Sequence, residues 1–270
     1  MVKKSDKSGV KETLRFPVLD IIRGFALVNM IFYHLLYNIV YIFDRNINWF
    51  VIPQTSTAYN QQVYLWQQLI CCTFIVISGL SFKLSRNPLK NGIKLFVCAL
   101  ILNLVTYLVV PDQFIVFGII HFFTAAVLLT YLAKPLLERL PANFGIFIAV
   151  FLFVLFKKLP SGYIGIFSIW QYRLHISLYQ SPYLFFLGLP HSGFRSADYF
   201  PIFPWWFLYL AGYYFHALYQ QIVSIVMKRK RKKLFFPTVV LGFMGRNSLI
   251  IYMLHQPILY GILLLVYFFN

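Results

Sequence analysis

The hydrophobic and polar positions of this chain alternate on the scale of whole helices. Long apolar runs are separated by short polar or basic segments, and nearly every run is long enough to cross a bilayer, the fifth being the shortest. The runs cover residues 17–42, 61–82, 92–110, 114–133, 143–157, 202–226 and 244–268. Because only helices or closed barrels span membranes, this pattern predicts an all-α polytopic transmembrane bundle of about seven spans.

Composition indicates the same class of protein. The chain is 60% hydrophobic and 11% charged, and no soluble domain of 270 residues buries that much apolar surface. The net charge of +17 is carried by short basic segments between the apolar runs, so it fits membrane topology, and no nucleic-acid partner is expected. The three cysteines lie in apolar runs and no His/Cys cluster has zinc spacing, so we expect neither a disulfide framework nor a metal.

The basic residues also predict an orientation. Seventeen Lys and Arg side chains flank the runs on one side of the expected bundle and five lie on the other. The positive-inside rule then predicts a cytoplasmic N-terminal tail (1–16), an extracytoplasmic C-terminus and a location in the plasma membrane. Residues 1–270 are expected to form one integral membrane domain, with 158–201 as a long, ordered outer segment before the sixth span.

The first apolar run carries a polar seam. At 100° per residue, five residues fall within roughly 60° of one line along this helix: Asp20, Arg23, Gly24, His34 and Asn38. Ionisable side chains at membrane depth are costly and usually face a bundle interior or a wet cavity. One interpretation is an Asp20–Arg23 ion pair at the membrane edge with His34 as an interhelical contact; the other is a functional cavity lined by this helix.

Other polar side chains are expected on the outer half of the bundle. His34 lies about 16 Å beyond Arg23 at 1.5 Å per residue, His121 begins the fourth span at its outer end, and Asp198 precedes the sixth. His255 lies within the last span, where we expect it to matter for packing. The sequence therefore predicts that histidines and one carboxylate converge near the outer surface.

Four segments resemble the heparan-α-glucosaminide N-acetyltransferase catalytic-domain family, and they occur in the family's order. They are the opening helix and the stretches 117–132, 196–212 and 245–257. The opening pattern Arg-x-x-x-Leu/Val-Asp-x-x-Arg-Gly is matched by Arg15, Leu19, Asp20, Arg23 and Gly24. The chain is most similar to the short bacterial members of this family.

The resemblance implies a reaction across the membrane. Family enzymes take an acetyl group from acetyl-CoA on the cytosolic side and deliver it to an amino sugar on the far side. An Asn late in the opening helix and a His in the following loop are implicated in activity; His34 occupies the Asn position, and the loop 43–60 contains no His. If the reaction needs a histidine base, this chain must supply it as His34, His121 or His255, or it is not the same enzyme. We expect His34 or His121 as the base, with Asp198 orienting a histidine or binding the acceptor.

The expected donor is acetyl-CoA or another acyl-CoA. Its phosphates need cations at the cytoplasmic mouth, where Arg23 and Arg246 are expected. The alternative for both arginines is topological anchoring. The predicted partners are the bilayer, acyl-CoA and an extracytoplasmic glycan or glycolipid acceptor.

Two other functions remain open at this point. A small-molecule or proton-coupled transporter would use the same buried polar groups as a relay, and a non-catalytic membrane scaffold would use them for packing. The chain shows no internal repeat, which disfavours the transporter.

Overall fold

The computed structural model describes residues 17–52, 59–166, 169–227 and 236–268. Its long helices, in chain order, are α1 (Pro17–Tyr37), α2 (Gln61–Leu84), α3 (Pro88–Val109), α4 (Ile119–Leu137), α5 (Ala142–Phe156), α6 (Ile202–Met227), α7 (Phe236–Arg246) and α8 (Ser248–Phe268). A π-helical turn, η1 (Asn38–Ile42), extends α1, and two strands, β1 (Tyr163–Ile166) and β2 (Trp170–Arg173), form a hairpin. The remaining elements are four 3₁₀ turns: η2 (Pro111–Gln113), η3 (Leu159–Ser161), η4 (Ile176–Tyr179) and η5 (Phe185–Leu187). The expected N-terminal tail (1–16) and the basic segment 228–233 lie outside the described residues.

The prediction of an all-α polytopic membrane bundle is confirmed. Six helices of the described residues are long and apolar enough to cross a membrane, and they correspond to six of the seven predicted spans. The remaining span, 202–226, is α6, whose 26 residues suffice in length but include several Tyr and Trp side chains. The first half of α6 lies deep inside the bundle, where Tyr209 and Tyr213 are fully buried.

Local sequence sets where two of the spans begin and where one ends. The Asn60 side chain accepts a hydrogen bond from the backbone N–H of Gln62 at the start of α2, and Asn87 does the same for Lys90 at the start of α3. These caps satisfy N–H groups that have no partner within the helix. Pro111, two residues after the end of α3, begins the 3₁₀ turn η2 and thereby fixes the sharp turn towards α4.

Two pairs of helices approach closely through glycine. A Cβ built on Gly79 of α2 would lie 1.9 Å from the carbonyl oxygen of Tyr209, and one on Gly212 of α6 would lie 2.0 Å from that of Val76. The crossing of α1 and α7 has the same design, since a Cβ on Gly24 would lie 1.9 Å from the carbonyl oxygen of Leu241. Such backbone-to-backbone contact is the usual way that membrane helices pack without a hydrophobic driving force between them.

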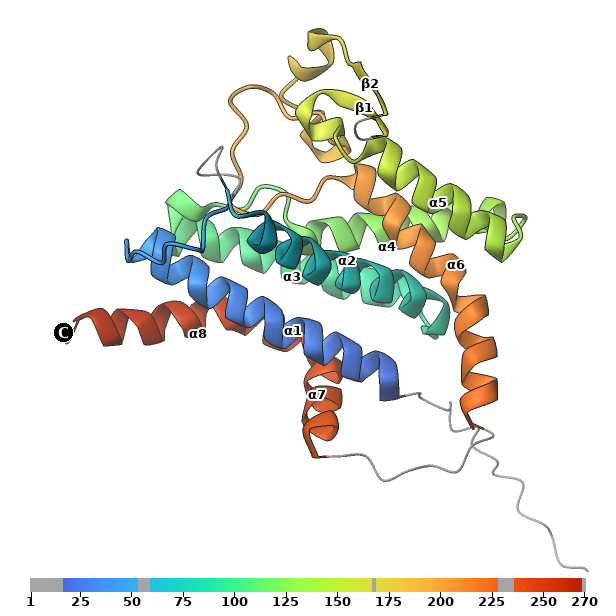
Figure 1. Cartoon of the computed structure of the whole chain (residues 1–270), viewed down its shortest axis with the longest axis horizontal. Coiled ribbons are helices and arrows are strands. Elements are labelled where there is room, and N and C mark those ends of the chain that lie inside the picture. The colour runs from blue at the N-terminus through green and yellow to red at the C-terminus, as the bar shows by residue number, and fades with distance from the viewer. Residues whose placement is uncertain (1–16, 53–58, 167–168, 228–235, 269–270) are drawn as a thin grey trace, which may run out of the picture.

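The arrangement of helices is seen in Figure 1. Helix α1 runs beside α2, α2 packs against α6, α6 against α5, and α3 against α4. The larger core cluster lies between α2, α4 and α6, around Phe122, Tyr209 and Tyr213, and the second lies between α1, α2 and the segment that follows η1. Helix α7 stands across the first half of α1, and α8 then runs along the second half of α1 in the same direction.

The end of the chain differs from the sequence-based prediction. The run 244–268 was predicted to be one span, but the structure divides this region between α7, which is too short to cross, and α8. Asn247 separates the two helices. Just before the break, Gly245 contacts the backbone of α1 so closely that a Cβ there would lie 1.8 Å from the carbonyl oxygen of Asp20.

The segment 158–201, predicted to be an ordered outer segment, folds into a compact cap beyond the ends of α5 and α6 (Figure 1). The antiparallel hairpin pairs Tyr163 with Arg173 and Ile166 with Trp170. Hydrogen bonds from tyrosine hydroxyls stabilise the part of the segment outside the hairpin. Tyr179 donates to the carbonyl oxygen of Leu159 at 2.6 Å, and Tyr199 donates to that of Phe185 at 2.6 Å. We call this segment the cap, and the end of the bundle that carries it the cap end.

Candidate active site

A polar cluster joins the end of the first helix to the last helix. His34 and Asn38 lie four residues apart on α1 and the π-helical turn η1, so both face α8. His255 and Gln256 of α8 meet them: the imidazole rings of His34 and His255 lie 5.0 Å apart between centroids. π-helical turns are frequent at functional sites, and here the turn begins at Asn38, which is fully buried.

Gln256 fixes the tautomer of His34. The side-chain Nδ2–H of Asn38 donates to Oε1 of Gln256 at 3.0 Å, which turns the amide nitrogen of Gln256 towards His34. That nitrogen donates to Nδ1 of His34 at 2.9 Å. Because Nδ1 accepts, the proton of a neutral His34 resides on Nε2. His34 therefore presents an N–H donor from the edge of its ring opposite Gln256.

His255 has the complementary tautomer. Its Nδ1 makes a short hydrogen bond with the backbone carbonyl oxygen of Tyr252, and since a carbonyl only accepts, Nδ1 must carry the proton. The lone pair of a neutral His255 is then on Nε2. That atom is buried and has no hydrogen-bond partner among the described residues.

A second buried acceptor in the same cluster is also without a partner. Among the described residues, Oδ1 of Asn38 receives no hydrogen bond, although the residue has 0% exposure. A buried polar atom without a partner costs about 1–3 kcal/mol, so two in one cluster indicate a place for a bound polar group. The cluster thus offers a ligand two acceptors and, from His34, one donor.

Asp198 approaches this cluster from the cap. Its carboxylate accepts a hydrogen bond from the backbone N–H of Ile119 at 2.9 Å and so caps the first turn of α4. Burial raises the pKa of this carboxyl to about 6, against the opposing effect of the Ile119 N–H. The charge of Asp198 also acts on the Tyr252 phenol of α8, whose ring lies 5.2 Å from that of His255.

His121 is held within the structure of the cap end. Its Nδ1 accepts a hydrogen bond from the backbone N–H of Gly118 at 3.3 Å. The amide of Asn103 lies 2.8 Å from its Nε2. Both ring nitrogens thus have protein partners. Of the histidines predicted to converge, His34 and His255 meet, and His121 lies in the first turn of α4, close to Asp198.

Arg23 occupies the other end of α1. It pairs with Asp20 at 3.4 Å, donates to the Ser81 hydroxyl at 2.7 Å and reaches the carbonyl oxygen of Gly245 at 3.4 Å. The Asp20–Arg23 ion pair of the first interpretation is present in the structure. The other two contacts of Arg23 link α1 to α2 and α7. Arg246 is exposed at the end of α7, next to this contact.

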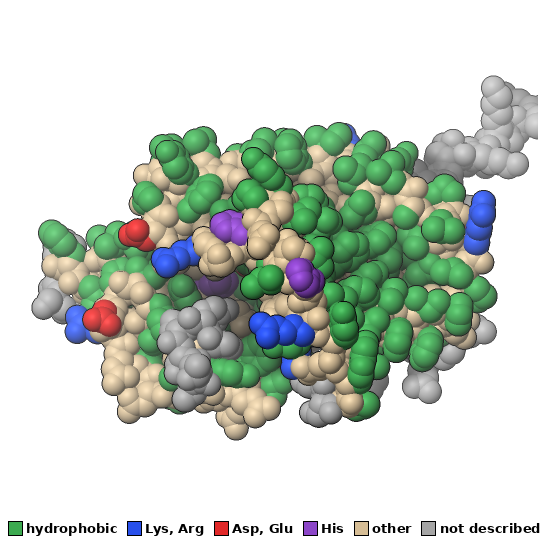
Figure 2. Space-filling view, turned by 90° about the horizontal axis from the view of Figure 1, so that it is seen from above, with side chains coloured by type: hydrophobic (Ala, Val, Ile, Leu, Met, Phe, Trp, Pro, Cys, Tyr) green, Lys and Arg blue, Asp and Glu red, His purple; other side chains and the backbone are tan. Residues whose placement is uncertain are grey.

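A cavity of about 640 Å³ lies beside the C-terminal end of α1. Its wall includes Tyr37, Gln113 and Arg195, and it extends along 111–114 and 195–197. The Tyr37 ring is 6.5 Å from that of His34, so the cavity adjoins the histidine cluster. Figure 2 shows that histidine and charged side chains gather around a hollow in the middle of the cap end, whereas hydrophobic side chains cover its flanks.

The sequence profile of the heparan-alpha-glucosaminide N-acetyltransferase catalytic family matches residues 15–257. The chain belongs to this family. The match covers most of the chain and includes both sides of the histidine cluster. No curated protein and no solved structure matches the sequence.

Family membership makes this chain a membrane acetyltransferase-like protein and implies acetyl-CoA as the general donor. Within the described residues, no group of three or more His, Cys, Asp or Glu side chains is arranged to hold a metal ion. Asn38 and Gln256 were not among the predicted catalytic or binding residues, and His255 was expected to act in packing. The signal for Asn38 was its place on the polar seam; nothing in the sequence indicated that Gln256 would contact His34.

Proposed function

We propose that this protein transfers an acyl group, in the first instance acetyl, from cytosolic acyl-CoA to an extracytoplasmic glycan or glycolipid. The observation that carries the proposal is the histidine pair: the two rings lie 5.0 Å apart between centroids, Nε2 of His255 is a buried acceptor without a partner among the described residues, and Nε2 of a neutral His34 carries a proton. Acyl transfer needs this combination, a base for the acceptor's proton and a donor for the oxyanion.

The proposed reaction begins when the acceptor's hydroxyl or amine attacks the thioester carbonyl carbon. Its proton passes to Nε2 of His255, while the N–H of His34 stabilises the negative charge that develops on the carbonyl oxygen. The tetrahedral intermediate collapses as the C–S bond breaks, and the proton held by His255 passes to the departing CoA sulfur. Oδ1 of Asn38 accepts a hydrogen bond from the acceptor and so helps to orient it.

The two substrates are proposed to reach the site from opposite ends of the bundle. The acceptor enters through the cavity beside Tyr37 at the cap end, which faces away from the cytoplasm in the orientation that the basic residues favour. Acyl-CoA binds from the other end, where Arg246 is exposed and Arg23 fastens the neighbouring helices. The proposed location is the plasma membrane, with the N-terminus cytoplasmic and the C-terminus outside.

The earlier catalytic assignments of His121 and Asp198 stay predictions. Their contacts support a structural contribution, because both bind the first turn of α4. Asp198 also stays a candidate for binding the acceptor, since it lies within electrostatic range of Tyr252. Activity measurements on His121→Ala and Asp198→Asn, compared with their melting temperatures, separate the two roles.

The test of the function uses cell-envelope glycans from three strains: one with the protein, one without it and one with His255→Asn. Mass spectrometry is expected to find an acylated glycan or glycolipid only in the first strain. The purified protein should also bind acetyl-CoA. Identical acylation in all three strains, together with no acyl-CoA binding, would show that the protein is not an acyltransferase.

A further inference from the structure

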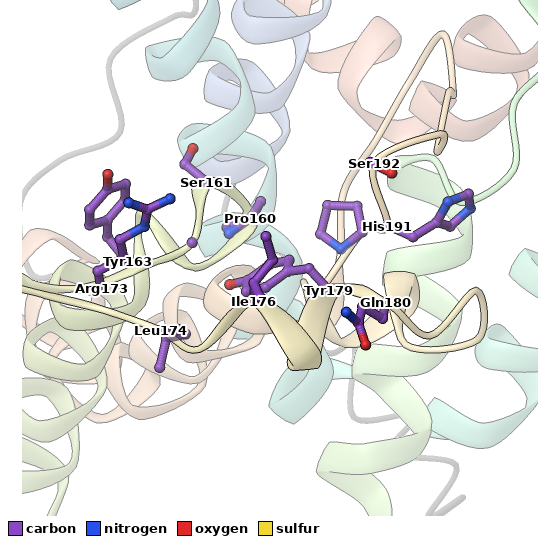
Figure 3. Close-up of a pocket in the computed structure, with 12 residues that line it drawn as sticks. Pro160, Ser161, Tyr163, Arg173, Leu174, Ile176, Tyr179, Gln180, His191 and Ser192 are labelled. Carbon is purple, nitrogen blue, oxygen red and sulfur yellow. The ribbon is translucent and has the colours of Figure 1, made fainter.

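The cap contains a second cavity that the proposed reaction does not use. It has a volume of about 590 Å³, within the roughly 300–1,000 Å³ common for small-molecule sites. None of its lining residues belongs to the histidine cluster or to the cavity beside Tyr37. Figure 3 shows Tyr163 and Arg173 on one side, Gln180 and His191 on the other, and Tyr179 between them.

The cavity is built on hydrogen-bonded backbone. Its left wall in Figure 3 is the hairpin, whose register places Tyr163 opposite Arg173, and the backbone N–H of Leu174 donates to the carbonyl oxygen of Gly162 at 2.9 Å. Its floor is fixed by the bond from the Tyr179 hydroxyl to the carbonyl oxygen of Leu159. Groups held in this way lose little conformational entropy when a ligand binds.

The lining supplies many hydrogen-bonding groups and one permanent charge. Arg173 is exposed, and its side chain has no hydrogen-bond or ion-pair partner among the described residues. His191 accepts from the backbone N–H of Gly193 through Nδ1, which leaves an N–H at Nε2. The amide of Gln180 and the hydroxyls of Ser161 and Ser192 supply further donors and acceptors.

The charges of the whole cap are one-sided. Between residues 158 and 201 the sequence holds three Lys and Arg residues and a single acid, Asp198, whose carboxylate is used to cap α4. Among the described residues, no Asp or Glu lines the cavity. The surface around Arg173 is therefore positive and attracts anions.

From these observations we propose that the cap cavity binds a saccharide bearing a carboxylate. The planar guanidinium of Arg173 matches a carboxylate in a two-bond geometry. The amide, imidazole and hydroxyl groups match sugar hydroxyls, and the rings of Tyr163 and Tyr179 offer apolar faces to the C–H side of a sugar ring. The binding takes place without acyl-CoA, so the proposal does not depend on the proposed function.

The experiment measures binding of tetragalacturonate to the full-length protein in detergent by isothermal titration calorimetry, without acyl-CoA. The controls are the matched neutral tetragalactoside and glycerol phosphate, which represents a phospholipid headgroup. The wild type is expected to bind the acid at least tenfold more tightly than the neutral sugar, with affinity that falls as salt rises. Equal binding of acid and neutral sugar, or no binding of the acid at millimolar concentration, would overturn the proposal.

Three variants locate the site. Arg173→Gln should weaken binding of the acid by about ten- to a hundredfold and remove most of its salt dependence, because one charge-assisted contact is lost. Gln180→Ala should weaken binding less and keep the salt dependence. Lys90→Gln removes a charge from the exposed start of α3 and should bind like the wild type. Unchanged affinity in Arg173→Gln, or tighter binding of glycerol phosphate than of the uronate, would refute the assignment.

Discussion

The assignment of His255 as the base can be tested with a single substitution, because asparagine replaces the role of Nδ1 and removes Nε2. In His255→Asn the side-chain amide nitrogen takes the place of Nδ1, so it keeps a donor for the carbonyl oxygen of Tyr252. The substitution removes Nε2 and with it the buried lone pair that no described residue satisfies. Stability should therefore be largely preserved while the proposed base is lost.

The expected size of the effect follows from the proton transfer. Loss of a general base typically lowers a rate by 10²–10⁴, which corresponds to about 3–5 kcal/mol in the activation free energy. The melting temperature should change little, since a retained hydrogen bond is worth about 0.5–1.5 kcal/mol. The assay is the release of free CoA thiol from acetyl-CoA in the presence of envelope glycans, with protein in lipid nanodiscs and with melting temperature measured on the same samples.

His34→Asn is the matched variant. Its side-chain oxygen takes the place of Nδ1 and accepts from Gln256, so the Asn38–Gln256 contact persists while the N–H donor is lost. We expect a smaller loss than at His255 and no change in the acid limb of the pH–rate profile, which His255 sets by its protonation. Turnover of His255→Asn within threefold of the wild type, at unchanged melting temperature, would refute the reasoning.

Three other predictions concern the donor, the cap and the packing. Arg246→Ala should weaken acyl-CoA binding roughly 10- to 150-fold in an equilibrium binding assay, because a charge-assisted contact is lost. An unchanged affinity would show that Arg246 serves only to set the membrane topology. Asp198→Asn keeps an acceptor for the Ile119 N–H but no longer titrates. Since the folded pKa of Asp198 is raised to about 6, its stabilising contribution is complete below the unfolded pKa of about 4 and is lost as pH rises through 6. The melting temperature of the wild type should therefore fall relative to that of Asp198→Asn as the pH rises from 4.5 to 7.5. Parallel curves of melting temperature against pH for the two proteins would contradict this. Gly212→Ala should destabilise the bundle by about 1–3 kcal/mol, because its Cβ would lie 2.0 Å from the carbonyl oxygen of Val76. This should appear as a lower melting temperature. Gly261→Ala, whose Cβ has open space, is the control and should leave the melting temperature unchanged.

The spans could be predicted because their signal is local. Each apolar run is long, and its ends are marked by prolines or by capping residues such as Asn60 and Asn87. The hairpin was missed for the opposite reason, since strands of four residues are too short for their periodicity to differ from that of other apolar runs. The division between α7 and α8 was missed because no local pattern marks it; Gly245, just before the break, contacts α1 at Asp20, 225 positions earlier in the chain.

The residues of the candidate site likewise include some that a local sequence pattern indicates and others that depend on contacts between distant parts of the chain. His34 was found because the polar seam of the first helix is a local pattern. The tautomers of His34 and His255 were beyond reach, because they follow from Gln256 and from the carbonyl of Tyr252 once α8 lies against α1. Asp198 was read as a catalytic group, yet its closest partner is the N–H of Ile119, 79 residues away, which no local pattern indicates.

The two interpretations of the polar seam on α1 apply to different halves of it. At the start of the helix, Arg23 is engaged by Asp20, by the Ser81 hydroxyl and by the carbonyl of Gly245, and such a satisfied network stabilises helix packing. At the end of the helix, Asn38 and His255 retain buried acceptors that no described residue satisfies. Because a folded protein rarely leaves such atoms unpaired, the C-terminal half of the seam is where a substrate would bring the missing hydrogens, and the N-terminal half holds the helices that position it.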